Sequence, residues 1–239
     1  PTYLLESPHY RQMVQSFADS TGIPILTGLP SYDMQTERTW NSAGLFLPGE
    51  FDVQRYHKIH LVPFGEAFPL DNVFPSLRKI ELGQANWDEG TEKVVFRGSR
   101  LPPFHVAICF ESIFPDLNRD FIRKGSQFIT VITNDVWFGP YASPIQHAMI
   151  SVLRAIEFRR PVVRCANTGI SMLIDPYGRI ERRTKTFERV ILTGNITPRS
   201  DMTFYARFGN IFSLGCLCFS IVAIGYSALT KRRCNARTL

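Results

Sequence analysis

One uncharged stretch near the C-terminus limits what this chain can fold into more than any other feature. Residues 208–229 read FGNIFSLGCLCFSIVAIGYSAL and contain no Asp, Glu, Lys or Arg. A membrane-spanning helix needs about 20 predominantly apolar residues to cross a hydrocarbon core of about 30 Å, whereas a helix buried in a protein core, the alternative here, is usually shorter. We therefore predict one transmembrane helix over 207–230, between a folded domain over 1–200 and a basic tail over 231–239.

The charges around this stretch predict an orientation. The formal net charge is +6, and four positive charges fall in the tail, at Lys231, Arg232, Arg233 and Arg237. Because basic residues are enriched on the cytoplasmic side of membrane helices, the tail should be cytoplasmic and the domain should face outward. The rest of the chain lacks basic clusters interleaved with aromatic residues, so we expect no nucleic-acid partner.

Upstream of the apolar stretch, short strand-like runs alternate with helical patterns. Helical periodicity covers 8–20 and 143–159. The strand-like runs are 23–29, 42–47, 94–97, 105–109, 128–133, 162–166, 171–174 and 190–194. This order predicts a layered α/β domain with a mostly buried sheet. Residues 67–92 are irregular and rich in Pro, Asn and Gly, and a loop of this length within a domain is often a functional lid.

No pattern in the sequence indicates a metal or an organic cofactor. The five cysteines, at 109, 165, 216, 218 and 234, form neither a paired framework nor a C-x-x-C spacing. His57 and His60 have no matching Asp or Cys spacing and are interpreted as structural. We expect no cofactor and no metal site.

Cys109 is the candidate nucleophile. It ends an apolar strand-like run and precedes Phe110, Glu111 and Ser112, where a helix can begin. A thiol at such a turn gains exposure and nearby backbone N–H groups, which favour a reactive thiolate and can hold an oxyanion. The alternative is a buried structural cysteine, which is common among free cysteines.

Five further residues are candidates for the same site. Lys58 could serve as a fixed cation beside a thiolate, with Glu66 close behind it in the sequence, or it could be a surface lysine. Asn134 and Trp137 follow a buried strand, where α/β sheets place ligand sites, or they form a simple polar turn. Glu111 could orient Lys58, contact substrate, or only begin a helix.

Three blocks of sequence carry a resemblance to a known family. They are HKIHLVPFGEAFPL, AICFES and NDVWFGPYASPIQHAMISVLRAIEFRRPVVRCANTGISMLIDPYGRI. Together they resemble the carbon–nitrogen hydrolase (nitrilase) superfamily, and within it the branch of apolipoprotein N-acyltransferases, over almost the entire chain. The resemblance implies an α-β-β-α layered domain with a Glu–Lys–Cys triad. Lys58 and Cys109 match its lysine and nucleophile, and Glu66 and Glu111 match acidic residues close to the active site.

The same resemblance implies a reaction and a location. A fatty acyl chain would pass from a phospholipid to Cys109 as a thioester, and then to the α-amino group of a diacylglyceryl-modified apolipoprotein. The domain would face the periplasm from the bacterial inner membrane. Two other interpretations remain: a membrane-tethered amidase or nitrilase that hydrolyses a small amide, and a catalytically inactive, membrane-anchored binding domain.

Two departures from the family pattern qualify these expectations. The triad glutamate belongs to a Trp-Pro-Glu type segment well ahead of the lysine, which would lie before Pro1, and Glu6 in LLESP lacks that motif. Phe110 stands where many members have a tyrosine. The family also carries membrane helices ahead of the domain, so we expect this chain alone to show little activity.

Overall fold

The computed structural model describes residues 7–68, 87–139 and 142–235, with side chains as far as residue 227. Glu6 and most of the predicted lid, residues 69–86, lie outside the described residues. The basic tail lies partly outside them as well.

The N-terminal part forms one helix and an antiparallel sheet of order β1-β2-β3. Pro8 opens the helix, where a proline loses no intrahelical hydrogen bond, and Gly22 closes it with a φ of 68°. Ala18 of the helix packs on Leu29 and Phe46 of the sheet. The elements are α1 (Pro8–Thr21), β1 (Ile25–Asp33), β2 (Arg38–Phe46) and β3 (Gln54–His57).

A second sheet of order β4-β5-β6-β7-β8-β9 follows. Its middle strands β5, β6 and β7 run parallel, and the outer pairings are antiparallel. Parallel neighbours need crossover connections, which α2 (Pro115–Arg123) and α3 (Ser143–Phe158) supply. The strands are β4 (Phe96–Gly98), β5 (Leu101–Ile108), β6 (Phe128–Asn134), β7 (Val162–Asn167), β8 (Met172–Ile174) and β9 (Ile180–Arg183).

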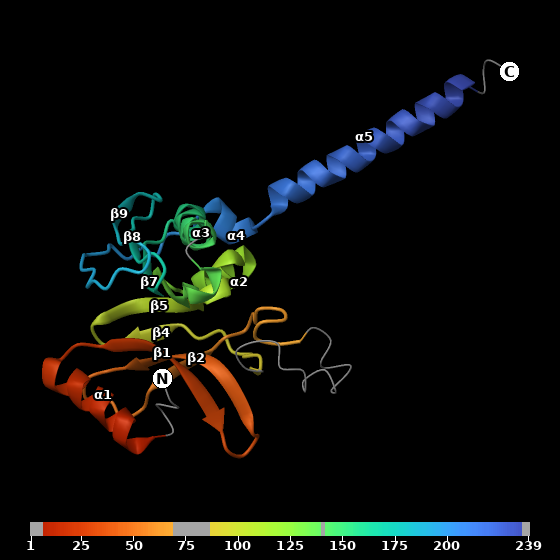
Figure 1. Cartoon of the computed structure of the whole chain (residues 1–239). Helices are drawn as coiled ribbons and strands as arrows, with labels where there is room; N and C mark the ends of the chain where they lie inside the picture. The colour runs from red at the N-terminus through yellow and green to blue at the C-terminus, as the bar shows by residue number, and fades with distance from the viewer. Residues whose placement is uncertain (1–6, 69–86, 140–141, 236–239) are drawn as a thin grey trace.

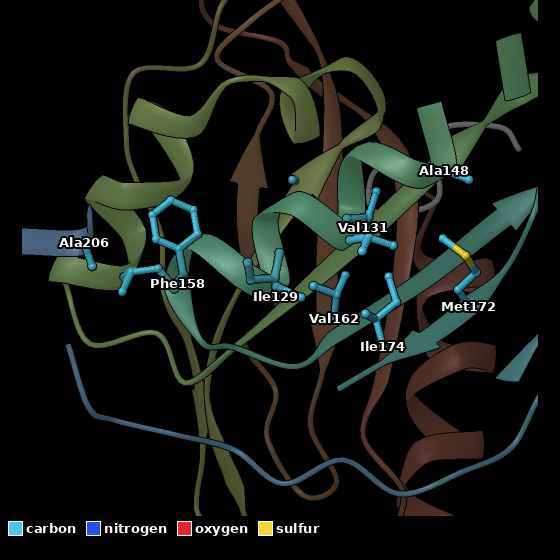
Figure 2. Close-up of a cluster of buried hydrophobic side chains, with 12 residues drawn as sticks. Ile129, Val131, Ala148, Phe158, Val162, Met172, Ile174 and Ala206 are labelled. Carbon is cyan, nitrogen blue, oxygen red and sulfur yellow. The ribbon is translucent and has the colours of Figure 1, made fainter. Parts of the chain in front are cut away.

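The two sheets pack face to face between helices, so that α1 covers one outer side and α2 and α3 cover the other (Figure 1). Between α3 and the second sheet lies an apolar cluster in which Phe158 meets strand residues such as Ile129 and Val162 (Figure 2). A second cluster, which includes Leu45, Phe104 and Val106, lies between the sheets. The predicted α-β-β-α domain is confirmed.

One predicted strand is wrong. Residues 190–194 have no regular secondary structure, and Ile191 is 90% exposed. An apolar run can satisfy its backbone groups as a strand only where a neighbouring strand is available to pair with it. In the described sheet β9 lies at the edge, and this segment does not extend it.

The chain ends in two helices, α4 (Phe204–Phe208) and α5 (Ile211–Asn235), and α5 extends away from the domain (Figure 1). A helix thus covers most of the segment predicted as a transmembrane helix over 207–230, beginning at Ile211 and continuing to Asn235, and its role as a membrane span stays a prediction. Within the described part of the chain, no helix meets both the length and the apolarity needed to cross a membrane.

Candidate active site

Cys109 lies where β5 ends and the short helix η2 (Cys109–Ile113) begins. Its φ is 53°, a left-handed conformation that costs a non-glycine residue on the order of 1–2 kcal/mol. The thiol is free and half-buried. Such strain persists only where the surrounding structure holds it, and it clusters at functional sites. The predicted position of Cys109 at a strand-to-helix turn is confirmed.

Lys58, immediately after β3, forms a buried ion pair. Its Nζ donates to Oε2 of Glu66 at 2.5 Å, and Lys58 is 0% exposed. The Glu66 carboxylate also accepts from the backbone N–H of Val62 at 2.8 Å and from the side-chain amide of Asn41 at 3.0 Å. These contacts exclude the surface-lysine interpretation. A buried pair with satisfied lone pairs holds its ammonium in one place.

Glu111 joins the segments that carry the two predicted catalytic residues. Its Oε2 accepts from the backbone N–H of Ile108, next to Cys109, at 2.8 Å. Its Oε1 accepts from the N–H of Ile59, next to Lys58, at 2.7 Å, from the Tyr56 hydroxyl at 2.7 Å and from the N–H of His60 at 3.2 Å. Burial raises the pKa of Glu111, although these four donors oppose the rise. The carboxylate therefore acts as a clamp behind the site.

Asn134 and Trp137 lie at the edge of the second sheet where Cys109 lies. Asn134 ends β6 opposite Asn167 of β7, and Trp137 belongs to the short helix η3 (Asp135–Phe138) that follows it. The carboxyl ends of parallel strands meet at one edge of a sheet, where ligands bind in open α/β sheets. Trp137 is 63% exposed. Its contact with a substrate, and that of Asn134, stay predictions.

The sequence reasoning missed a buried polar network behind Cys109. The carbonyl oxygen of Cys109 accepts from the Ser112 hydroxyl at 2.9 Å and lies 3.1 Å from Nε2 of His147. Nδ1 of His147 lies 3.0 Å from Oδ1 of Asp135, and Oδ2 of Asp135 accepts from Arg164 at 2.8 Å. The available signal was Arg164, a charged residue inside an apolar strand.

The pKa values of Asp135 and Arg164 are each shifted by the charge of the other. Burial alone would raise the pKa of Asp135, but the hydrogen bond from His147 and the positive charge of Arg164 hold it below its ordinary value. Burial lowers the pKa of Arg164, and the negative charges of Asp135 and of the Cys109 thiolate oppose that shift.

Two histidines near Lys58 make structural contacts. His57 bonds the Ser42 hydroxyl at 2.7 Å and stacks on Trp40, and the ring of His60 packs against Phe114. Among the residues that the structure describes, no group of three or more His, Cys, Asp or Glu side chains could hold a metal ion.

Comparison with known proteins identifies relatives of this chain. Residues 6–203 match the carbon–nitrogen hydrolase family model. The chain is 35% identical over 235 residues to an apolipoprotein N-acyltransferase of Geobacter metallireducens, covering 98% of this chain and 44% of that protein. It is 34% identical to the protein of that name from Chlorobaculum tepidum, covering 96% and 47%. The chain thus spans less than half the length of these relatives.

Two solved structures share the fold. An amidase from Nesterenkonia sp. AN1 matches with a TM-score of 0.57 and 17% identity, covering 77% of this chain and 68% of that one; acrylamide had added to its active-site cysteine. Nit3 of Saccharomyces cerevisiae, a member of the nitrilase superfamily, matches with a TM-score of 0.55 and 20% identity, covering 74% and 61%.

Proposed function

Because the chain belongs to the carbon–nitrogen hydrolase family, we propose that it is the catalytic part of an N-acyltransferase of lipoprotein maturation. A fatty acyl chain passes from a phospholipid to the Cys109 thiol, and then to the α-amino group of the N-terminal diacylglyceryl-cysteine of an apolipoprotein. Relatives named apolipoprotein N-acyltransferase, which match nearly the whole chain, support this proposal.

The single observation that carries the proposal is that one carboxylate, Glu111, holds the backbone beside both the strained Cys109 and the buried Lys58. Glu111 bonds the N–H groups of Ile108 and Ile59, the neighbours of these two residues. A nucleophile and a fixed cation positioned by the same side chain can act on one carbonyl group.

The first half-reaction forms a thioester. The Cys109 thiolate attacks the carbonyl carbon of the phospholipid ester, and the charge that develops on the carbonyl oxygen is stabilised by the Lys58 ammonium. Collapse of the tetrahedral intermediate breaks the bond to the glycerol oxygen. That oxygen takes a proton and leaves as lysophospholipid, while the acyl group stays on sulfur.

The second half-reaction forms an amide. The α-amino group of the acceptor attacks the thioester carbonyl and loses a proton, and the carbon–sulfur bond breaks to restore the thiolate. Both halves need a general base. Glu66 pairs with Lys58, and Glu111 accepts four hydrogen bonds, so we assign the base to the glutamate that the family resemblance places ahead of the lysine.

We also propose that α5 is the membrane helix, with the tail cytoplasmic and the domain on the periplasmic face of the inner membrane. The sequence carries no charge over 208–229, and apolar side chains along α5, such as Phe212, Phe219 and Ile224, are exposed. Two lipid substrates give such a domain a reason to stay at the bilayer surface.

A second candidate function is hydrolysis of a small amide with water as the acceptor. The fold shared with the Nesterenkonia amidase favours it, and the same Cys109 and Lys58 would serve both reactions. The two candidates differ in what reaches the enzyme-bound acyl group: an amine for the transferase and water for the hydrolase.

Intact-mass measurement on the whole protein in detergent with phospholipid separates the candidates. We expect an added fatty-acyl mass that hydroxylamine removes, and that Cys109→Ala abolishes. Cys165→Ala is the matched control, because Cys165 is a second free and more exposed thiol, and it should keep the adduct. A folded protein without the adduct that releases ammonia from small amides would overturn the transferase proposal.

A further inference from the structure

We propose that His147, held by Asp135 and Arg164, is the positioning residue that keeps the Cys109 turn in its reactive conformation. The inference rests on the proposed function only in taking Cys109 as the nucleophile. Neither the Lys58–Glu66 pair nor the Glu111 clamp contacts the carbonyl group of Cys109, whereas His147 does.

The Cys109 turn needs something to hold it. A φ of 53° is unfavourable for any residue with a β-carbon, and the strand that leads into it would otherwise continue in extended geometry. Two side chains engage the Cys109 carbonyl, the Ser112 hydroxyl at 2.9 Å and His147 Nε2 at 3.1 Å. Nε2 of His147 also lies 3.1 Å from the Ser112 hydroxyl. Ser112 lies in the same turn, so of these two side chains His147 is the one that reaches the Cys109 carbonyl from another element.

His147 is held from behind by two other elements. It projects from α3, Asp135 begins η3 and Arg164 lies in β7. Nδ1 of His147 lies 3.0 Å from Oδ1 of Asp135 and 3.1 Å from Nη2 of Arg164. Asp135 and Arg164 are each 1% exposed and His147 is 5% exposed. A buried network with charge-assisted bonds resists movement of its members.

Arg164 has hydrogen-bonding capacity beyond this network. Its Nε donates to the carbonyl of Ile170 and its Nη2 to Asp135, but within the described residues its buried Nη1 has no hydrogen-bond partner. An unpaired N–H on a buried cation is costly. Burial lowers the pKa of Arg164, and the negative charges of Asp135 and Cys109 oppose that shift.

The chemistry of the carbonyl group decides which nitrogen of His147 matters for positioning. A carbonyl oxygen only accepts, so Nε2 must carry a hydrogen to bond the Cys109 carbonyl. The side-chain amide of a glutamine can place an N–H close to the Nε2 position. An asparagine amide reaches only the Nδ1 position, beside Asp135. His147→Asn therefore removes both the imidazole ring and the contact with the Cys109 carbonyl, whereas His147→Gln removes the ring but can keep that contact.

The test measures how fast iodoacetamide alkylates Cys109 in the whole detergent-solubilised protein, with the modified peptide identified by mass spectrometry. We expect His147→Asn to slow alkylation of Cys109, and single-turnover formation of the acyl-enzyme, by about tenfold or more, with KM for phospholipid unchanged. His147→Gln should recover most of both rates. Arg164→Gln should slow both, whereas Arg160→Gln should slow neither.

Arg160 is the matched control because it is also a buried arginine at 1% exposure, bonded to backbone carbonyls such as that of Ser126. Wild-type alkylation and acylation rates in His147→Asn would overturn the inference. It would also be overturned if both rates fell equally in His147→Asn and His147→Gln, in step with a fall in melting temperature. Failure of the proposed function has a different signature: the wild-type protein would form no acyl-enzyme, while Cys109 alkylation would still report on the turn.

Discussion

At the scale of single residues, the strongest feature of this protein is a cysteine in a conformation that cysteine does not favour. A left-handed φ at Cys109 directs the backbone out of the strand, and the thiol lies half-buried at the sheet edge. Glycine would adopt this conformation without steric cost, but it would carry no nucleophile. The proposed reaction therefore requires a cysteine here despite the energetic cost of the turn.

This cost is measurable by comparing two inactive variants. Cys109→Ala and Cys109→Gly both remove the thiol, but only glycine relieves the left-handed strain. We expect the Gly variant to exceed the Ala variant in free energy of unfolding by about 1 kcal/mol, measured by chemical denaturation. The added flexibility of glycine in the unfolded chain offsets part of the gain. A Gly variant clearly less stable than the Ala variant would show that the turn is not strained.

At the scale of elements, β5 performs two tasks along one strand. Cys109 follows its last residue, Ile108, and four residues before Cys109 the side chain of His105 ties the strand to α2 and to the turn before β6. The ring of His105 is 0% exposed, with Nδ1 2.8 Å from the Ser126 hydroxyl and Nε2 3.1 Å from Oδ1 of Asn118. The side chain of Asn118 in turn donates to the carbonyl of Glu111 at 3.0 Å. Support for the Glu111 clamp thus continues through α2 to β5.

Burial of His105 makes this support sensitive to acid. Burial lowers the pKa of His105 to about 4, the Asn118 contact opposes the shift, and the charge of Arg160 adds to it. The folded protein therefore binds this proton less readily than the unfolded chain, whose histidine titrates near 6.5. The stability that neutral His105 contributes is present above pH 6.5 and is lost as pH falls toward 4.

The wild-type protein should have a lower free energy of unfolding at pH 4.5 than at pH 7. We expect this difference to be roughly 2 kcal/mol smaller in His105→Gln. Chemical denaturation at the two pH values measures this difference. His9→Gln, at an exposed position in α1, is the control and should leave the acid dependence unchanged. An acid dependence in His105→Gln equal to that of the wild type would contradict the assignment.

At the scale of the whole molecule, the chain divides into a four-layer domain and one long helix. The domain buries its apolar side chains between its layers, whereas those of α5 remain exposed along its described length, with Phe212 at 78%. α5 leaves the domain (Figure 1), so the domain does not cover these apolar side chains. The bilayer of the proposed topology would cover them on all sides.

Alkaline phosphatase fused after residue 239 reports on which side of the membrane the C-terminus lies. In the native sequence we expect an inactive fusion, because a cytoplasmic enzyme does not form its disulfides. Leu217→Arg combined with Ile221→Arg should block insertion of α5, at about 3 kcal/mol for each arginine near the helix centre, and leave the fusion active in the periplasm. Leu217→Phe with Ile221→Leu is the control and should stay inactive. An active fusion on the native sequence would contradict the proposed topology.

Much of the fold was predictable because it depends on local patterns. The alternation of strand-like and helical periodicity predicted the layered domain, and the bounds of α1 and α3 came within one residue of the predicted 8–20 and 143–159. Residues 190–194 show where such patterns fail. Their apolar character is local, but strand formation depends on a partner that only the arrangement of the sheet can provide.

The candidate site shows the same difference between what local sequence patterns predict and what depends on the packing of distant segments. By itself, the sequence indicated Cys109 at a strand end, Lys58 and Glu66 in one segment, and Glu111 beside the cysteine, because each depends on near neighbours. Only the tertiary structure decided that Lys58 is buried, and that the Glu111 carboxylate joins segments more than forty residues apart in the sequence. It alone assembled His147, Asp135 and Arg164 behind the nucleophile. Hydrogen bonds between distant segments depend on how the layers pack, and no local spacing encodes that packing.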